Sequence, residues 1–101
     1  MEKINGVVET HYGNGQLESR TTYKDGKLNG MWETWYENGQ PRTKTTCKND
    51  KVDGLLETWY DNGKPSSRAK YKDGNLDGLR ELWDRDGKLK ESATYKDGVK
   101  Q

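Results

Sequence analysis

Short runs of alternating hydrophobic and polar residues recur along the chain, and the same pattern returns every 24 residues. Within each unit, runs rich in Thr, Trp, Tyr and Val are separated by glycine-containing dipeptides. Four units follow one another without insertion, over residues 5–28, 29–52, 53–76 and 77–100. A fixed period of this kind predicts a stacked array, in which each unit contacts mainly its neighbours.

Each unit contains two turn signals. The first turns are Asn14-Gly15, Asn38-Gly39, Asn62-Gly63 and Asp86-Gly87, and the second are Asp25-Gly26, Asn49-Asp50, Asp73-Gly74 and Asp97-Gly98. Such dipeptides between β-type runs favour two-residue type I′ hairpin turns, because both central residues need a positive φ. The sequence therefore predicts an all-β fold, an elongated antiparallel β-meander of four 24-residue hairpin repeats with about eight strands. We expect one domain over residues 1–101.

The predicted turn geometry also fixes a register. A type I′ turn at Asn38-Gly39 places Tyr36 opposite Pro41 and Trp35 opposite Arg42. The same geometry predicts three cross-strand pairs of a glutamate with a basic residue: Glu9–Arg20, Glu33–Lys44 and Glu57–Arg68. In the fourth unit Glu81 meets Ser92 instead. A further glycine in each unit, such as Gly30, predicts a bulge or a place where an aromatic ring lies over the backbone.

This register gives the sheet two different faces. One face is predicted to carry Tyr12, Tyr36, Tyr60, Leu17, Pro41, Pro65, Trp32, Leu56, Tyr23, Tyr71, Tyr95, Ala69 and Ala93. The other is predicted to carry His11, Trp35, Trp59, Trp83, the glutamates Glu9, Glu33, Glu57 and Glu81, and Val7, Met31, Leu55 and Leu79.

Composition narrows the class of protein. Hydrophobic residues make up 28% of the chain and charged residues 35%, but the net charge is only +1 and 10% of residues are aromatic. We therefore expect a folded array with a thin, aromatic core rather than disorder. The charge balance gives no support for nucleic-acid binding. The opening MEKINGVVE has no apolar signal-peptide region, which favours a cytoplasmic protein.

Catalytic and metal-binding groupings cannot be assembled from this sequence. His11 is the only histidine and Cys47 the only cysteine, so neither a catalytic triad nor a zinc-ligand set is expected. Cys47 stands where the other units have tyrosine, which favours a packing role. We predict a non-enzymatic protein with no cofactor and no metal.

Four copies of one motif carry a family resemblance. The motif G-x-W-E-x-W-Y-x-N-G followed by Y-K-D-G is present as GMWETWYENG with CKND, and as GLLETWYDNG with YKDG. Over residues 5–100 the chain resembles the MORN repeat in its bacterial variant form. The resemblance implies an elongated β-hairpin array that acts as a protein-binding or scaffolding module. Some members are linked to membrane lipids, and many bacterial ones are regarded as antitoxins.

The best candidate surface in the sequence is the row of tryptophans that recurs every 24 residues. The residues predicted to bind a partner are Trp35, Trp59, Trp83, Tyr36, Tyr60 and Arg42. The alternative is that these rings pack on the sheet and fill its core. The glutamate row is explained by its basic partners, and the lysines beside the second turns by solvated turns.

These observations predict a module that binds a protein, in its sharpest form a bacterial antitoxin or immunity protein that occludes a partner toxin. Two alternatives remain open, a self-assembling structural scaffold and a peripheral membrane-lipid-binding module.

Overall fold

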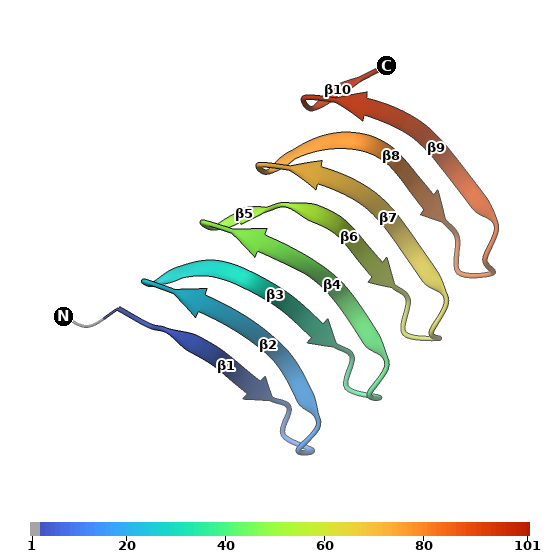
Figure 1. Ribbon diagram of the computed structural model, residues 1–101. Helices are drawn as coiled ribbons and strands as arrows, with labels where there is room; N and C mark the ends of the chain where they lie inside the picture. The colour runs from blue at the N-terminus through green and yellow to red at the C-terminus, as the bar shows by residue number, and fades with distance from the viewer. Residues whose placement is uncertain (1–2) are drawn as a thin grey trace.

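The alternating runs form strands that pair with their neighbours in the chain, in one antiparallel sheet (Figure 1). The strands of this computed structural model, which describes residues 3–101, are β1 (Gly6–His11), β2 (Leu17–Lys24), β3 (Lys27–Trp35), β4 (Pro41–Lys48), β5 (Lys51–Val52), β6 (Gly54–Trp59), β7 (Pro65–Lys72), β8 (Asn75–Trp83), β9 (Leu89–Lys96) and β10 (Val99–Lys100). Met1 and Glu2 of the expected domain lie outside the described residues. No helix occurs in 3–101, and the all-β meander is confirmed.

The sheet has ten strands instead of the eight expected, because one strand is divided into β5 and β6 and the short strand β10 is added at the end. β5 and β6 together match β3 and are separated at Asp53. β10 follows the last of the second turns and pairs with β9. The main order, β1-β2-β3-β4-β6-β7-β8-β9-β10, is that of a simple meander.

The second turn of each unit has the predicted type I′ geometry. In the first unit Asp25 and Gly26 have φ values of 53° and 80°, and Lys24 pairs directly with Lys27. In the second unit, Asn49 and Asp50 both adopt positive φ, at 50° and 69°. Two-residue loops of this kind require positive φ at both central positions. The prediction is therefore confirmed for the second turns.

The first turn of each unit differs from the prediction. The Tyr36 N–H donates to the Gln40 carbonyl (2.8 Å) and the Gly39 N–H to the Tyr36 carbonyl (2.9 Å). Only Gly39 has a positive φ, at 88°. The loop is thus a three-residue turn that ends in a glycine bulge. The Asn38 Oδ1 accepts from the Gln40 N–H (2.9 Å), so the asparagine stabilises this turn through its side chain instead of adopting positive φ.

The longer loop changes the pairing beside it. Trp35 lies opposite Pro41, so the predicted pairs Trp35–Arg42 and Tyr36–Pro41 are wrong. Because partners share a face, Pro41 belongs with Trp35, and by the same pairing Leu17 lies with His11 and Pro65 with Trp59.

The register shifts between Thr34 and Trp35, because Arg42 of β4 is an extra residue between Pro41 and Thr43. This shift restores the predicted alignment. Glu33 therefore does lie opposite Lys44.

The further glycine marks a bulge in the second, third and fourth units, as predicted, whereas Gly6 pairs with Tyr23 without a register shift. Gly30 has a φ of 123°, and the β2–β3 register shifts between Thr21 and Tyr23. A Cβ at Gly30 would lie 3.1 Å from two side-chain atoms of Thr22. The close neighbour is thus a threonine and not an aromatic ring. The glycine is needed both for its φ and for the space.

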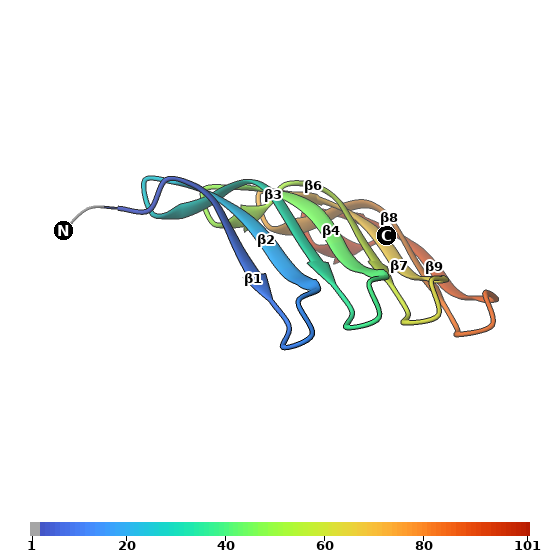
Figure 2. The same cartoon turned by 90° about the horizontal axis from the view of Figure 1, so that it is seen from below.

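The array is one layer thick, with extents of 44 × 34 × 13 Å. Viewed from below, its strands bend in the same direction (Figure 2). Within residues 3–101 the buried side chains are those of Thr21, Thr45, Cys47 and Ala69. The core is thin as expected, but the aromatic rings are half-buried, and small side chains take the buried positions.

Candidate protein-binding face

Strand alternation and the observed register place four glutamates on one face of the sheet. We call this face, which carries Glu9, Glu33, Glu57 and Glu81, the glutamate face. The opposite face, which carries the buried Thr21, Thr45, Cys47 and Ala69, we call the threonine face. The two faces differ in burial, because the buried side chains all lie on the threonine face.

A ladder of alternating charge crosses the glutamate face. Arg20 lies opposite Glu9 on one side and opposite Glu33 on the other. The Arg20–Glu9 ion pair measures 2.8 Å, and the corresponding Arg68–Glu57 pair measures 3.6 Å.

All three predicted glutamate–base registers are confirmed. Sequence reasoning missed that each base lies between two glutamates, because it considered only one hairpin at a time. Such exposed pairs set the register and charge balance more than the stability.

The tryptophan row lies on the glutamate face beside the first turns. Trp35, Trp59 and Trp83 are half-buried. The Arg20 guanidinium lies over the Trp35 ring, 5.7 Å from its centroid. A shallow cavity of about 160 Å³ is lined by Trp59 and Trp83, together with Pro65 and neighbouring polar residues. These rings therefore pack against the sheet and still present surface.

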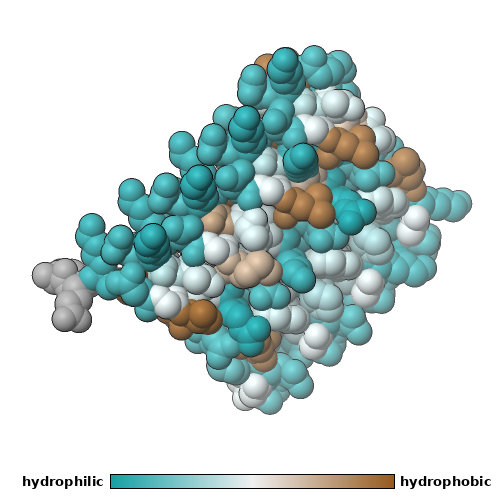
Figure 3. Space-filling model, in the orientation of Figure 1, coloured by the Kyte–Doolittle hydropathy of each residue, from teal (hydrophilic) through white to brown (hydrophobic). Residues whose placement is uncertain are grey.

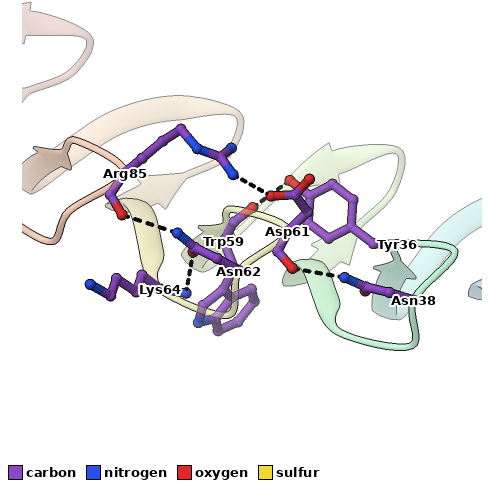
Figure 4. A network of polar contacts seen from close by, with 7 residues as sticks. All are labelled: Tyr36, Asn38, Trp59, Asp61, Asn62, Lys64 and Arg85. Atoms are coloured by element: carbon purple, nitrogen blue, oxygen red, sulfur yellow. Dashed lines mark hydrogen bonds and ion pairs between the residues drawn. The ribbon is translucent and has the colours of Figure 1, made fainter.

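The tyrosines of the predicted site join one unit to the next, as Figure 4 shows for Tyr36. The Tyr36 hydroxyl donates to the Trp59 carbonyl (2.6 Å), and the Tyr60 hydroxyl to the Trp83 carbonyl (2.7 Å). Arg42 is exposed and its guanidinium lies 5.5 Å from the centroid of the Tyr36 ring. The tyrosine hydroxyls are thus already hydrogen-bonded within the array, and only the ring surface is available for other contacts.

Asparagines of the first turns make a second inter-unit connection, also shown in Figure 4. The Asn38 amide donates to the Asp61 carbonyl (2.8 Å), and the Asn62 amide donates to the Arg85 carbonyl (3.1 Å). Arg85 and Asp61 form an ion pair of 2.6 Å. Its hydrogen bond with Asp61 raises the pKa of Arg85 above the ordinary arginine value. The row of turns is thereby held at a fixed spacing.

A row of exposed aliphatic side chains runs along the same face. Val7, Leu55 and Leu79 are 60%, 41% and 50% exposed, and Met31 at the equivalent position is half-buried. A hollow of about 300 Å³ is lined by Met31, Leu55 and polar neighbours. In the view of Figure 3, apolar side chains recur along the array among polar ones. Sequence reasoning placed this row on the correct face but did not include it in the site.

Cys47 does not belong to a reactive site. Its side chain is 6% exposed, on the threonine face. Burial, and secondarily the charge of Asp50, raises the pKa of the thiol. Among residues 3–101 no group of three or more His, Cys, Asp and Glu side chains could hold a metal ion. In the same residues no helix is long and apolar enough to span a membrane.

Comparison with known sequences identifies the repeat. No curated protein matches this chain. The family described as MORN repeat variant matches residues 4–25, 28–49, 52–73 and 76–97, which together make up most of the sequence. Repeats of this kind indicate a protein- or lipid-binding module and are typically non-enzymatic. The chain therefore belongs to the MORN repeat variant family.

Proposed function

We propose that this chain is a protein-binding module that docks a partner protein on its glutamate face. The observation that carries the proposal is the exposed aliphatic row of Val7, Leu55 and Leu79 beside the half-buried tryptophan row. Exposed apolar surface rimmed by polar groups is typical of interaction sites. Trp residues add large contact area at a small cost in conformational entropy.

The charge ladder on this face favours a protein over a lipid surface. Acidic and basic side chains alternate along the ladder Glu9, Arg20, Glu33, Lys44 and onwards. An anionic membrane attracts an excess of basic residues, which this ladder does not offer, because each of its bases lies between two glutamates. Alternating charges suit a partner whose own charges are complementary, and they set specificity and orientation.

The sharpest form of the proposal is an antitoxin or immunity-type inhibitor. A single-layer array 44 Å long can cover the active site or an essential surface of another protein and block it by occlusion. The inter-unit bonds from Tyr36, Asn38 and their equivalents hold the array rigid, so little conformational entropy is lost on binding. The resemblance to bacterial variant repeats points to this role.

A capture experiment with face-specific variants tests the proposal. The tagged chain is used to capture proteins from a lysate of its source, and the captured protein is then titrated against purified variants. We expect the double variant Leu55→Glu, Leu79→Glu to weaken binding at least about tenfold, because charges would enter an apolar contact. Both side chains are exposed, so the fold should persist.

Neighbouring residues of β1 supply the matched control, because Val7 and Val8 are both exposed and point to opposite faces. Val7→Glu should weaken binding, whereas Val8→Glu should not. Equal effects of both would contradict docking on the glutamate face. If the chain captures no protein but sediments with vesicles of phosphatidylserine and phosphatidylcholine, the module binds lipid instead.

A further inference from the structure

The sheet has two edges that differ in chemistry. At one edge, no strand in residues 3–101 pairs with the outer side of β1, and all six of its residues are exposed. At the other edge, β9 meets only the two-residue strand β10 beyond its pairing with β8. An open edge presents unpaired backbone groups that can bind another strand.

The interior of the array shows which kind of strand pairs with an edge like that of β1. The strands equivalent to β1 are β3, β6 and β8, and each is covered at this edge by β2, β4 and β7 respectively. In each pairing a basic residue lies opposite the glutamate: Arg20 opposite Glu33, Lys44 opposite Glu57 and Arg68 opposite Glu81. At β1 the equivalent glutamate is Glu9, whose outer side has no base in the described residues.

Two further contacts accompany this pairing in the interior. A tyrosine hydroxyl donates to the backbone carbonyl of the tryptophan in the next unit, as Tyr60 does to Trp83. An asparagine amide donates to the backbone carbonyl two residues after that tryptophan, as Asn62 does to Arg85. The acceptors equivalent to these at the open edge are the carbonyls of His11 and Gly13.

The opposite edge does not offer the matching groups. Asp84 and Asp86 replace the tyrosine and the asparagine, and Ser92 replaces the basic residue. The Asp84 carboxylate accepts from the N–H groups of Asp86 (2.9 Å) and Lys88 (3.0 Å), within its own turn. A carboxylate has no proton to donate and would repel the carbonyl oxygens at the β1 edge. The β9 edge of a second copy is therefore a poor match for β1.

We propose that the outer edge of β1 is a strand-addition site for an extended segment of a partner protein. The segment carries a basic residue opposite Glu9 and a side-chain donor near the His11 carbonyl. It also carries a small residue opposite Val8, because Thr21 and Ala69 lie opposite the equivalent Trp32 and Arg80 in the array. Main-chain hydrogen bonds give such a complex its affinity, and the side-chain matches give its specificity. This inference goes beyond the proposed function, because it concerns an edge of the sheet and not the glutamate face.

A peptide of residues 60–72 is the probe, because in the array this segment supplies the tyrosine, the asparagine and the arginine to the next unit. Fluorescence anisotropy measures its binding to the full chain. Charge reversal in the peptide, Arg68→Glu, should weaken binding about tenfold. Glu9→Lys in the protein should do the same, and the two reversed partners together should restore binding.

Controls separate the alternatives. Glu91→Lys on β9 should leave peptide affinity unchanged, and circular dichroism should show that Glu9→Lys is folded despite losing the Arg20 pair. Failure of the unaltered peptide to bind, or a loss with Glu91→Lys alone, would overturn the site. Self-association in light scattering that Glu9→Lys removes would overturn the partner assignment in favour of a second copy.

The experiment also distinguishes this proposal from docking on the glutamate face. The Leu55→Glu, Leu79→Glu variant should still bind the peptide with unchanged affinity, because neither residue lies on β1. If that variant loses the peptide as well, the peptide binds the face and not the edge, and the inference is wrong.

Discussion

At the scale of the residue, polar side chains join each unit to the next by hydrogen bonds. The Tyr36 hydroxyl and the Asn38 amide each reach a backbone carbonyl of the next unit. Their recurrence every 24 residues was visible in the sequence, but their partners were not. A hydrogen bond between residues 23 positions apart depends on how one hairpin lies against the next, which no single hairpin reveals.

The tyrosine connection predicts a specific cost for losing one oxygen atom. Tyr36→Phe keeps the ring but leaves the Trp59 carbonyl without its 2.6 Å donor. We expect a loss of about 1 kcal/mol in the free energy of unfolding, or about 4–8 °C in Tm. Urea denaturation followed by tryptophan fluorescence measures it. Tyr71→Phe is the control, because in residues 3–101 the Tyr71 hydroxyl has no hydrogen-bond partner, and an equal loss there would contradict the explanation.

The buried thiol predicts an effect of pH. The pKa of Cys47 is raised, so at alkaline pH the folded chain holds this proton more tightly than the unfolded chain. The contribution of the neutral thiol to stability is complete below the unfolded pKa of about 8.5 and is lost as pH rises above it. The stability difference between the original chain and Cys47→Ala should therefore shrink from pH 7 to pH 10 in urea denaturation. A difference that does not change with pH would contradict the assignment.

At the scale of the element, the register was predictable away from the first turns and not beside them. The prediction assumed a two-residue loop at Asn38-Gly39. The structure instead has a three-residue loop and, next to it, a register shift between Thr34 and Trp35. The extra residues offset each other, so Glu33 still meets Lys44. The turn type itself was not predictable from the dipeptide, because the Asn38 side chain bonds the backbone and favours a different loop.

The bulge glycines predict a second change in stability. At Gly54 the φ is +124°, and a Cβ would lie 2.9 Å from the Thr46 Oγ1, which donates to the Asp53 carbonyl. Gly54→Ala should cost about 1–3 kcal/mol in the free energy of unfolding. Gly13→Ala, at a position with open space and no positive φ, should stay within about 0.5 kcal/mol.

A second substitution separates strain from crowding at this position. Adding Thr46→Ala to Gly54→Ala should recover the part of the cost that comes from the contact and leave the part that comes from φ. Urea denaturation of the original chain, Gly54→Ala, Thr46→Ala and the double variant gives the coupling energy between the two positions. No coupling at all would show that the close approach to Thr46 is unimportant.

At the scale of the whole molecule, the repeat determines almost everything that could be predicted. Period, strand order and the row of glutamates and tryptophans on one face follow from it, and all three are present in the structure, whereas Leu17, Pro41 and Pro65 lie on the face opposite to the one predicted. The aliphatic row was harder to recognise as a surface, because Val7, Leu55 and Leu79 look like core residues in a sequence. Only a single layer 13 Å thick leaves them without a cover.

The single-layer plan predicts that whole units can be removed. Deletion of residues 29–52 joins Leu28 to Asp53, which takes the place of Asn29, and brings Arg20 opposite Glu57 in the pairing it had with Glu33. Because each unit contacts mainly its neighbours, the shortened chain should fold. Its urea m-value should fall by about a quarter, since less surface is exposed on unfolding, and its stability should fall with it.

A smaller deletion is the informative control. Removing residues 29–40 takes out only half a unit, but it puts Lys44 at the position of Trp32, on the threonine face opposite Thr21. A charged side chain would then replace a half-buried apolar one beside the buried Thr21, and the charge ladder would lose its register. We expect this chain to lack a cooperative unfolding transition, although it is longer than the 29–52 deletion. If circular dichroism shows both chains equally folded, the strands tolerate a slip of half a unit, and the side-chain pairs do not set the register.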